Sequence, residues 1–217
     1  MGIRILLADD HRIVREGIRT LLEKQADLQV VGEACTGRET IELTRELLPD
    51  IILLDITMPE LNGIEATRHI LEENPAVKVI GLSVHCDKRF ALDMFMVGAS
   101  GYLTKDCAFE ELTKAIRAVM AGRVYVSAAI TENVMGSFVT SHADDDSLKL
   151  PRLSAKERLV LQLISEGKST KDVAHELDLS IKTIETYRLK IMNKLGITNV
   201  AGLVKYAIRE GLTSVEK

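Results

Sequence analysis

Several residue types that mark particular protein classes are scarce in this chain of 217 residues. Its three cysteines, Cys35, Cys86 and Cys107, are scattered, and neither they nor the five histidines show metal-type spacing. Such cysteine usage is typical of a reducing cytosol. No apolar run approaches the roughly 18 residues that a membrane span needs, and the N-terminus shows no signal-peptide pattern. We therefore expect a cytoplasmic protein with no transition-metal site and no membrane partner.

The charges are distributed unevenly along the chain, whose formal net charge is −4. Residues 151–217 carry 12 Lys and Arg against 8 Asp and Glu, which gives +4. The first 150 residues carry 16 against 24, which gives −8. The C-terminal part therefore suits a polyanionic partner, and the N-terminal part does not.

Five short apolar runs alternate with amphipathic helical patterns over residues 1–122. The runs are Ile3–Ala8, Leu28–Ala34, Ile51–Leu54, Val77–Ser83 and Gly101–Leu103. The helical patterns are Ile13–Lys24, Arg38–Leu47, Gly63–Glu73, Arg89–Val97 and Phe109–Ala121. Five such units predict a doubly wound, five-stranded parallel sheet with helices on both faces. A GxGxxG motif does not follow the first run, which disfavours dinucleotide binding.

Polar side chains stand at the ends of four of these runs. Asp9 and Asp10 follow the first run, Asp55 follows the third, Ser83 closes the fourth, and Lys105 comes just after the fifth. Ligands of open α/β sheets bind beyond the carboxyl ends of the strands, so we expect these side chains to converge. Three neighbouring carboxylates need a cation to stay ionised together, and oxygen ligands favour Mg²⁺. A carboxylate neutralised in this way can attack phosphorus, while a hydroxyl and an ammonium bind the phosphoryl group.

After residue 122 the sequence no longer alternates apolar runs with helical patterns. Residues 123–149 read as a linker, with a loose helical pattern over Ser127–Val139 and an acidic stretch after it. Residues 150–217 predict an all-α unit of four helices, the first of which begins at a capping box of Ser154 and Glu157. The other three are expected at Thr170–Leu177, Ile181–Leu195 and Asn199–Glu210.

The second and third of these helices form a helix-turn-helix pattern. The apolar positions of the third are expected to face the core, and they are Ile181, Ile184, Leu189, Ile191, Met192 and Leu195. Its cations favour the major groove of DNA, where Arg and Lys read guanine, Glu accepts from cytosine and Thr touches either. An ordinary solvated amphipathic helix is the alternative.

Residues 2–122 resemble a two-component receiver domain. The motifs that carry the resemblance are LLADDHRIVREGI, IILLDITMPELNGIEATRHI, VIGLSVH and GASGYLTKD. It implies a flavodoxin-like fold in which Asp55 is the phosphoacceptor. It also implies that Mg²⁺ is held by Asp9, Asp10, Asp55 and the backbone carbonyl of Thr57, and that the phosphoryl-binding and switch residues are Ser83, Tyr102 and Lys105. Thr57 and His85 occupy the positions that tune loss of the phosphoryl group in this family.

Residues 150–210 resemble the LuxR-type DNA-binding domain through LSAKERLVLQLISEGKSTKDVAHELDLSIKTIETYRLKIMNKLGI. The resemblance implies a set of DNA-contact candidates, namely Thr170, Lys171, Lys182, Thr183, Glu185, Thr186, Arg188 and Lys190. It also implies a dimer face on the fourth helix formed by Val200, Leu203 and Val204. An intramolecular core is the competing interpretation of these three apolar residues.

The whole chain resembles a NarL/FixJ-type response regulator. The resemblance implies a transcription factor, not an enzyme, in which a histidine kinase phosphorylates Asp55 and a phosphorylated homodimer binds double-stranded DNA. A Mg²⁺-dependent phosphatase is one alternative, but Thr57 stands where such enzymes carry a second acid. A phosphorelay module whose helical unit docks on a protein is another alternative, and steep salt dependence of DNA binding would argue against it.

Overall fold

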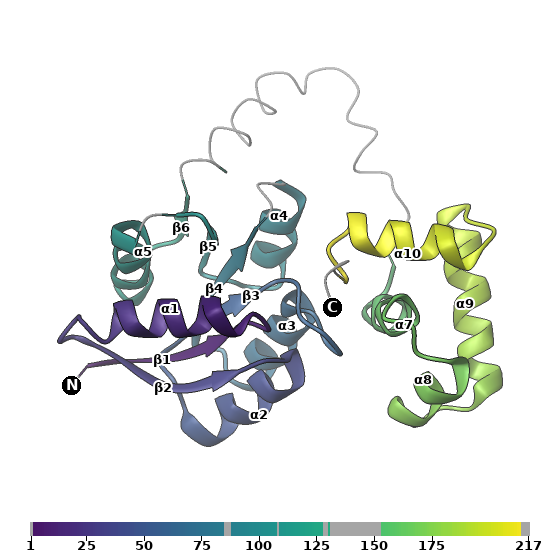
Figure 1. The fold of residues 1–217 in the computed structure, drawn as a ribbon, viewed down its shortest axis with the longest axis horizontal. Coiled ribbons are helices and arrows are strands. Elements are labelled where there is room, and N and C mark those ends of the chain that lie inside the picture. The colour runs from purple at the N-terminus through teal and green to yellow at the C-terminus, as the bar shows by residue number, and fades with distance from the viewer. Residues whose placement is uncertain (1, 85–87, 108, 128–129, 131–152, 214–217) are drawn as a thin grey trace, which may run out of the picture. The chain divides into compact units, whose positions relative to one another are not determined.

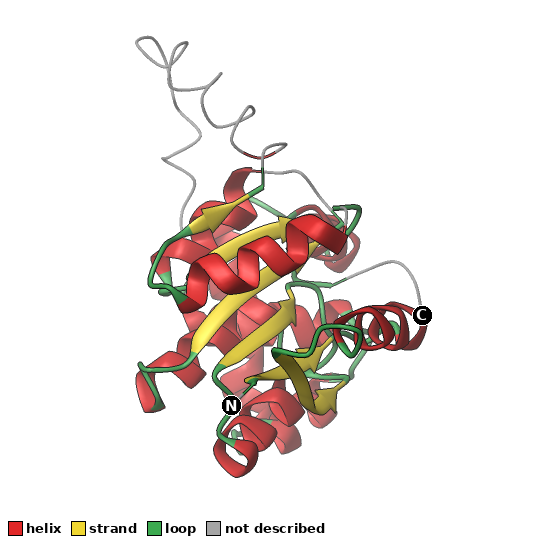
Figure 2. Ribbon diagram, turned by 90° about the vertical axis from the view of Figure 1, so that its left-hand side faces the viewer, coloured by secondary structure: helices red, strands yellow, loops and turns green. Residues whose placement is uncertain are grey.

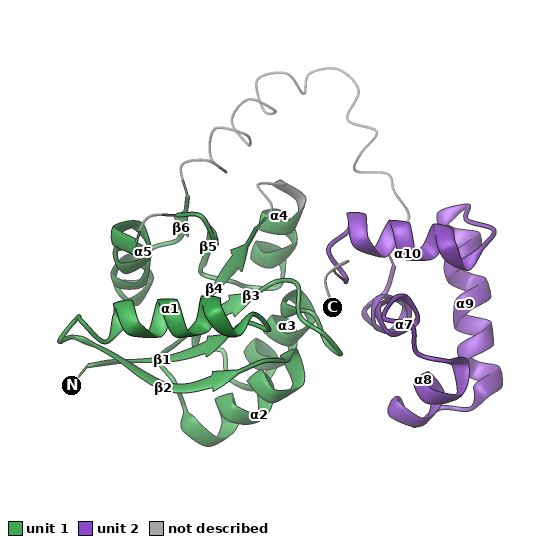
Figure 3. Cartoon of the chain, viewed as in Figure 1, with its two compact units in different colours: residues 1–142 green, residues 143–217 purple. Residues whose placement is uncertain are grey.

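A computed structural model describes residues 2–84, 88–107, 109–127, 130 and 153–213 of the chain. The chain divides into two compact units, residues 1–142 and 143–217, which are coloured separately in Figure 3. Most of the predicted linker lies outside the described residues, and so does His85. No helix in the described part of the chain is long and apolar enough to cross a membrane.

Unit 1 is built on a parallel β-sheet with the strand order β2-β1-β3-β4-β5-β6 (Figure 1). Its strands are β1 (Ile3–Ala8), β2 (Leu28–Ala34), β3 (Ile51–Asp55), β4 (Lys78–Ser83), β5 (Gly101–Thr104) and β6 (Tyr125–Val126). Its helices are α1 (Arg12–Leu22), α2 (Gly37–Leu47), α3 (Gly63–Glu73), α4 (Lys88–Met96) and α5 (Phe109–Met120). The predicted doubly wound parallel fold is confirmed.

Helices cover both faces of this sheet (Figure 2). On one face, Leu22 of α1 and Ile116 of α5 share a buried core with Ile5 and Leu53 of the central strands. On the other face α2 packs beside α3, and α3 beside α4. Because the central strands are covered on both sides, they are apolar along nearly their whole length, as the sequence shows.

The sheet has six strands, not the five predicted. Tyr125 and Val126 pair in parallel with Gly101 and Tyr102 of β5, and Ser127 N–H donates to Tyr102 O at 3.1 Å. A strand of two residues is too short to show either an apolar run or alternation, so the sequence pattern places these residues in the linker. The sheet therefore continues past the boundary predicted at residue 122.

The described part of unit 2 contains four helices, as predicted. They are α7 (Ala155–Ser165), α8 (Thr170–Glu176), α9 (Ile181–Leu195) and α10 (Val200–Arg209). The predicted capping box is present, with the Ser154 hydroxyl accepting from Glu157 N–H and the Glu157 carboxylate accepting from Ser154 N–H. α7 packs against the other three helices, and their apolar faces enclose one core.

The structure corrects the expected positions of Leu203 on α10 and of Ile181 and Leu189 on α9. Leu203 is fully buried in the core of unit 2, so the intramolecular interpretation holds for it, whereas Val200 is exposed and Val204 half-buried. On α9, Ile181 is 49% exposed and Leu189 is 59% exposed, although both were expected to face the core. Ile181 opens the helix, and Leu189 lies two turns after Lys182, on the same solvent-facing side.

The start of α3 lies directly against the end of β3. Asn62 caps the helix by accepting from Glu65 N–H at 3.0 Å, and Gly63 N–H donates to Ile56 O at 2.8 Å. A Cβ atom at Gly63 would lie 2.2 Å from the carbonyl oxygen of Asp55. Only glycine therefore permits this close approach, which fixes the backbone at Asp55 from one side.

We predict that Gly63→Ala lowers the free energy of unfolding by about 1–3 kcal/mol, because the backbone at Asp55 must shift to admit a methyl group. Gly17 is the matched control, since it lies in α1 with open space around its Cβ position. Gly17→Ala should raise the free energy of unfolding by about 0.5–1 kcal/mol through helix propensity. Chemical denaturation measures both, and equal effects of the two variants would contradict the prediction.

Candidate functional site

Three carboxylates and one imidazole gather at the carboxyl edge of the sheet. Ligand atoms of Asp9, Asp10, His11 and Asp55 lie within 4.8 Å of one another. β1 and β3 are neighbours in register, with Ala8 opposite Leu54, so the residues that follow these two strands meet. The chain leaves β1 for β2 on one side and returns to β3 on the other, which is the position where open α/β sheets bind ligands.

Lys105 lies between two of these carboxylates. Its Nζ is 2.8 Å from Asp55 Oδ2 and 2.7 Å from Asp9 Oδ2. Its backbone N–H donates to Ser83 O at 2.7 Å, which fastens the end of β5 to the end of β4. Ser83 is buried and pairs with Thr104 across the two strands. The structure thus places one ammonium and one hydroxyl-bearing residue at the same edge as the three acids.

Burial and charge repulsion act together on this cluster. Burial raises the pKa of Asp55 to about 6, against the opposing effect of Lys105, and the charge of Asp9 adds to the rise. Burial lowers the pKa of Lys105, but the Asp55 and Asp9 carboxylates outweigh burial and raise it above its usual value. One ammonium shared among three acids leaves the cluster negative, so a further cation is favoured there.

The donor set of the cluster fits a hard divalent cation. Asp9 Oδ2 and Asp10 Oδ1 are buried and accept no hydrogen bond of good geometry, although Lys105 Nζ and His11 Nδ1 lie 2.7 and 2.8 Å from them. Carboxylate oxygens with unused lone pairs suit Mg²⁺. His11 instead donates its backbone N–H to Asp9 Oδ1 at 2.8 Å, and Thr57 N–H reaches Asp55 Oδ1 at 3.1 Å, so both residues orient carboxylates.

Arg15 belongs to this site, although the sequence did not single it out. Its Nη1 donates to the carbonyl oxygen of Asp9 at 2.5 Å, and its Nε donates to Glu33 of β2 at 3.3 Å. Asp9 N–H in turn donates to Ala34 O at 3.1 Å. The turn that carries Asp9 is therefore held from both α1 and β2. The position of Arg15 in the first turn of α1 is the one sequence signal for this role, and that signal is not specific.

Tyr102 connects the edge of the site to α4. It is fully buried on β5, directly opposite Gly81 of β4. A side chain at Gly81 would meet Met94 of α4 at 2.9 Å and the Tyr102 ring at 3.6 Å. The space that Gly81 leaves is therefore filled by Met94 and Tyr102, which ties β5 to α4 three residues before Lys105.

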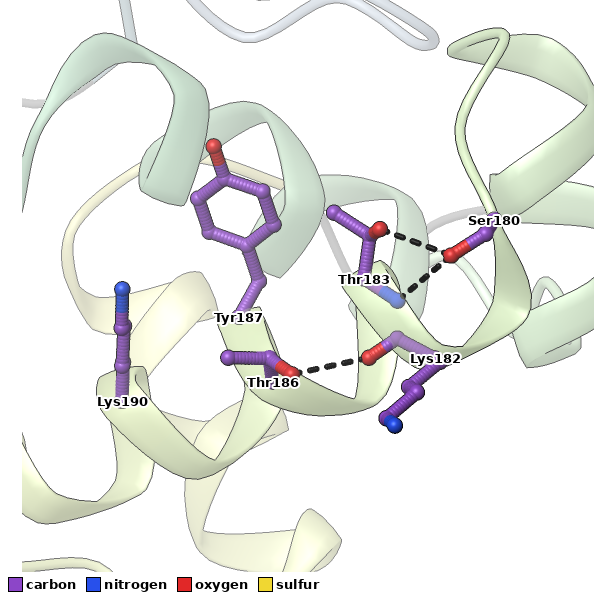
Figure 4. A pocket seen from close by; sticks show the side chains of 6 residues that line it. All are labelled: Ser180, Lys182, Thr183, Thr186, Tyr187 and Lys190. Atoms are coloured by element: carbon purple, nitrogen blue, oxygen red, sulfur yellow. Dashed lines mark hydrogen bonds between the residues drawn. The ribbon is translucent and has the colours of Figure 1, made fainter.

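A basic, hydroxyl-rich surface covers one side of α9 in unit 2. A hollow there is lined by Ser180, Lys182, Thr183, Thr186, Tyr187 and Lys190 (Figure 4). The helix start is fixed by the Ser180 hydroxyl, which accepts from Thr183 N–H at 3.1 Å. Figure 4 shows the Lys182 and Lys190 side chains extending away from the helix. Tyr187 is half-buried against the core of unit 2, which anchors the middle of the hollow.

The other predicted DNA-contact residues differ in how exposed they are. Glu185 is exposed, while Thr183 and Arg188 are half-buried. At the start of α8, Thr170 is half-buried and Lys171 exposed, and the helix is capped by a box in which Asp172 accepts from Ser169 N–H at 3.2 Å. The Asp172 carboxylate would repel a phosphate at this helix end, whereas the Lys171 ammonium would attract one.

Lys194, also on α9, has a structural role. Its Nζ lies 2.7 Å from the buried Glu157 carboxylate at the start of α7. Burial raises the pKa of Glu157, but hydrogen bonds from Lys194 and Ser154 outweigh it, so the pKa is lowered overall. This ion pair fastens the C-terminal end of α9 to α7.

Two family models match the chain, one in each unit. The response regulator receiver domain matches residues 5–117, and the luxR family of bacterial regulatory proteins matches residues 151–207. Among curated proteins, the response regulator GacA of Pseudomonas aeruginosa is 37% identical over 97% of both chains. The transcriptional regulatory protein MctR of Rhizobium johnstonii is 36% identical over 98% of this chain and 96% of its own length. The response regulator UvrY of Escherichia coli is 35% identical over 99% and 97%.

A solved structure of a response regulator matches this chain across both units, and another matches about two thirds of it. RcsB from Salmonella enterica serovar Typhimurium, bound to promoter rprA with the phosphomimetic BeF3−, matches with a TM-score of 0.66 and 28% identity. That match covers 95% of this chain and 98% of RcsB. A LuxR-family two-component response regulator from Aurantimonas has a TM-score of 0.62 and 43% identity over 64% of this chain and 99% of its own.

We predict that Asp55→Asn raises the free energy of unfolding at a pH of about 8, in chelator, by about 2–3 kcal/mol. The pKa of Asp55 is raised from 3.8 to about 6 in the folded state, so its ionised form opposes folding. The folded chain binds more protons than the unfolded chain between these values, so the wild type loses stability as the pH rises through this window. The variant lacks this loss, and its advantage should grow from pH 3.8 to about 6 and then level off.

Denaturation at several pH values measures this difference. Asp50→Asn is the matched control, because Asp50 is an exposed aspartate at the opposite end of β3 whose Oδ2 accepts from Arg4 N–H at 2.8 Å, a bond that an amide oxygen can also accept. An advantage of Asp55→Asn that does not change with pH would contradict the prediction.

Proposed function

Because this chain belongs to the response regulators that join a receiver domain to a LuxR-type DNA-binding domain, we propose that phosphorylation of Asp55 controls its action as a transcription factor. A histidine kinase donates the phosphoryl group in the cytosol, and Mg²⁺ is the cofactor. The phosphorylated chain dimerises and binds double-stranded DNA through α9. The receiver, the linker and the DNA-binding unit take residues 1–127, 128–149 and 150–217.

The observation that carries this proposal is the juxtaposition of Asp55 with Asp9, Asp10 and Lys105 at one edge of the sheet. Asp9, Asp10, Asp55 and the Thr57 carbonyl would hold Mg²⁺, which neutralises charge between the nucleophile and the phosphoryl oxygens. An Asp55 carboxylate oxygen attacks the phosphorus atom as the bond to the donor nitrogen breaks. Lys105 then pairs with a phosphoryl oxygen, and the Ser83 hydroxyl donates to another.

The contacts of Lys105 support a route from this site to the surface. Phosphorylation gives Lys105 a new anionic partner, and the Lys105 N–H is bonded to Ser83 O, so the ends of β4 and β5 respond together. Tyr102 on β5 packs near Met94 of α4, which passes the change to the α4–β5–α5 surface. A coupling of about 1–3 kcal/mol changes DNA affinity about 5–150-fold.

The LuxR-type unit supports the DNA-binding half of the proposal. α9 presents Lys182, Glu185, Thr186 and Lys190 to solvent on a rigid, capped helix. In a solved structure two RcsB dimers are bound to two parallel DNAs, which supports the same arrangement here. In this arrangement the phosphates are bound by Lys171, Lys182 and Lys190. These lysines are flanked by Thr170, Thr183 and Arg188. The base edges are reached by Glu185 and Thr186. Val200 and Val204 of α10 provide the dimer face.

We predict that the full-length chain gains one phosphoryl group from acetyl phosphate in the presence of Mg²⁺, and that its affinity for DNA rises about 5–150-fold. Asp55→Asn should gain none, because the nucleophilic carboxylate is gone, while Asp50→Asn should behave as the wild type. Intact mass and a DNA titration provide the two readouts. The proposal would be overturned if Asp55→Asn gained a phosphoryl group, or if the DNA affinity of the wild type did not change on phosphorylation.

We also predict that Lys182→Ala and Lys190→Ala each reduce the slope of log affinity against log salt by about 0.9, because each lysine neutralises one phosphate. A duplex of arbitrary sequence suffices, since this effect does not depend on base identity. Lys205→Ala on α10 is the control, because Lys205 is also exposed but lies on another helix. If the control lowers the slope as much as the α9 variants do, α9 is not the DNA-binding face.

A further inference from the structure

An exposed leucine stands within the polar stripe of α9. Lys182, Glu185, Thr186 and Leu189 follow one another at the spacing i, i+3, i+4 and i+7, and all four are exposed. Such residues lie along one side of a helix. Leu189 is 59% exposed, which leaves most of a large apolar side chain in water.

The fold holds Leu189 outward. Ile184 and Ile191 of the same helix are 1% and 0% exposed in the core of unit 2, so the rotation of α9 about its axis is set. The helix ends are fixed as well, by the Ser180 cap and by Gly196 in the left-handed conformation. Leu189 therefore cannot turn into the core without displacing the two isoleucines, so any partner that buries it comes from outside unit 2.

The surroundings of Leu189 fit DNA better than a protein partner. Lys182 lies two turns before it on the same stripe, and Lys190 follows it directly, so positive charge stands on both sides. Other large exposed apolar residues in the described part of unit 2 are Ile181 and Val200, which open their helices and do not extend the stripe. Protein-binding surfaces present a contiguous apolar patch. A single leucine between cations suits a single apolar group on a polyanion.

The spacing agrees with a known way of reading bases. Homeodomain recognition helices contact the major groove through residues spaced i, i+3, i+4 and i+7. The major groove offers one prominent apolar group, the 5-methyl of thymine, which accepts contacts from apolar side chains. Glu185, four residues before Leu189 on the stripe, can accept a hydrogen bond from the amino group of cytosine.

We propose that Leu189 determines sequence specificity by packing on the 5-methyl group of a thymine in the major groove, next to the base read by Glu185. The proposal rests on the proposed binding of DNA through α9 and adds to it the identity of one base. Lys182 and Lys190 position the helix on phosphates, and Leu189 packs on a methyl group that cytosine, adenine and guanine lack.

The test is a double-mutant cycle between the protein and the base. Duplexes are selected from a random pool with the full-length, phosphorylated chain, and each thymine of the selected site is replaced in turn by deoxyuridine, which lacks the methyl group. We expect one thymine in each half-site whose replacement weakens wild-type binding about three- to fivefold, the value of one buried methyl group. Leu189→Ala should weaken binding to the thymine duplex by a similar factor or more, and should be insensitive to deoxyuridine at that position.

Two controls separate this contact from other effects. Thr186→Ser removes the other methyl group of the stripe and keeps the hydroxyl, so it should retain the full sensitivity to deoxyuridine. Leu189→Ala removes no charge and no core contact, so the salt slope and the melting temperature should stay as in the wild type.

The outcomes are distinguishable. If the wild type binds no duplex, the proposed function fails and this inference fails with it. If the wild type binds but Leu189→Ala keeps the deoxyuridine effect, or no thymine shows one, only the Leu189 contact is overturned. If Leu189→Ala changes self-association in sedimentation and leaves DNA binding intact, the leucine contacts a second copy of the chain and the inference is wrong.

Discussion

The sharing of one ammonium by two buried carboxylates is the interaction on which the receiver unit depends. Lys105 lies within 2.8 Å of both Asp55 and Asp9, yet burial still raises the pKa of Asp55 to about 6. Such a cluster opposes folding when ionised, so the surrounding structure has to hold it in place. Gly63 packs closely against the carbonyl oxygen of Asp55, and Arg15 donates a hydrogen bond to the carbonyl oxygen of Asp9. A phosphoryl group and its cation would relieve the same imbalance of charge, which is why ligand binding and stability are linked at this site.

The same lysine also explains how an event at Asp55 can be felt elsewhere. Its side chain belongs to the acidic cluster, while its backbone N–H belongs to the contact between β4 and β5. Three residues earlier, Tyr102 fills space left by Gly81 together with Met94 of α4. Because the interior is closely packed, a shift of Lys105 toward a new anion cannot stay local to its side chain.

The sequence predicts the sheet and the acidic cluster well because both follow from one physical rule. Buried parallel strands read as apolar runs, and their carboxyl ends must meet, so the polar residues after them are brought together whatever the loops do. The same reasoning misses Tyr125–Val126, because a two-residue strand leaves no periodic pattern. It misses Arg15, because a side chain that bonds a backbone carbonyl looks like any charged helix residue. On α9 and α10 the apolar pattern identifies amphipathic helices but not which leucine faces which way, and Leu189 and Leu203 were both misplaced for that reason.

Those two leucines show how the DNA-binding unit separates stability from recognition. Leu203 is held in the core with Ile184 and Ile191, which fix how α9 is rotated. Leu189 lies on the opposite side of the same helix and adds nothing to that core, so the residue there is free to vary with the base that it meets. In the proposed complex, the positive charge of Lys182 and Lys190 would give affinity for DNA of any sequence, whereas Glu185, Thr186 and Leu189 would respond only to particular base edges. In the proposed function phosphorylation acts on the receiver unit and leaves these side chains unchanged, so it would alter how tightly the chain binds DNA without altering which sequence the chain prefers.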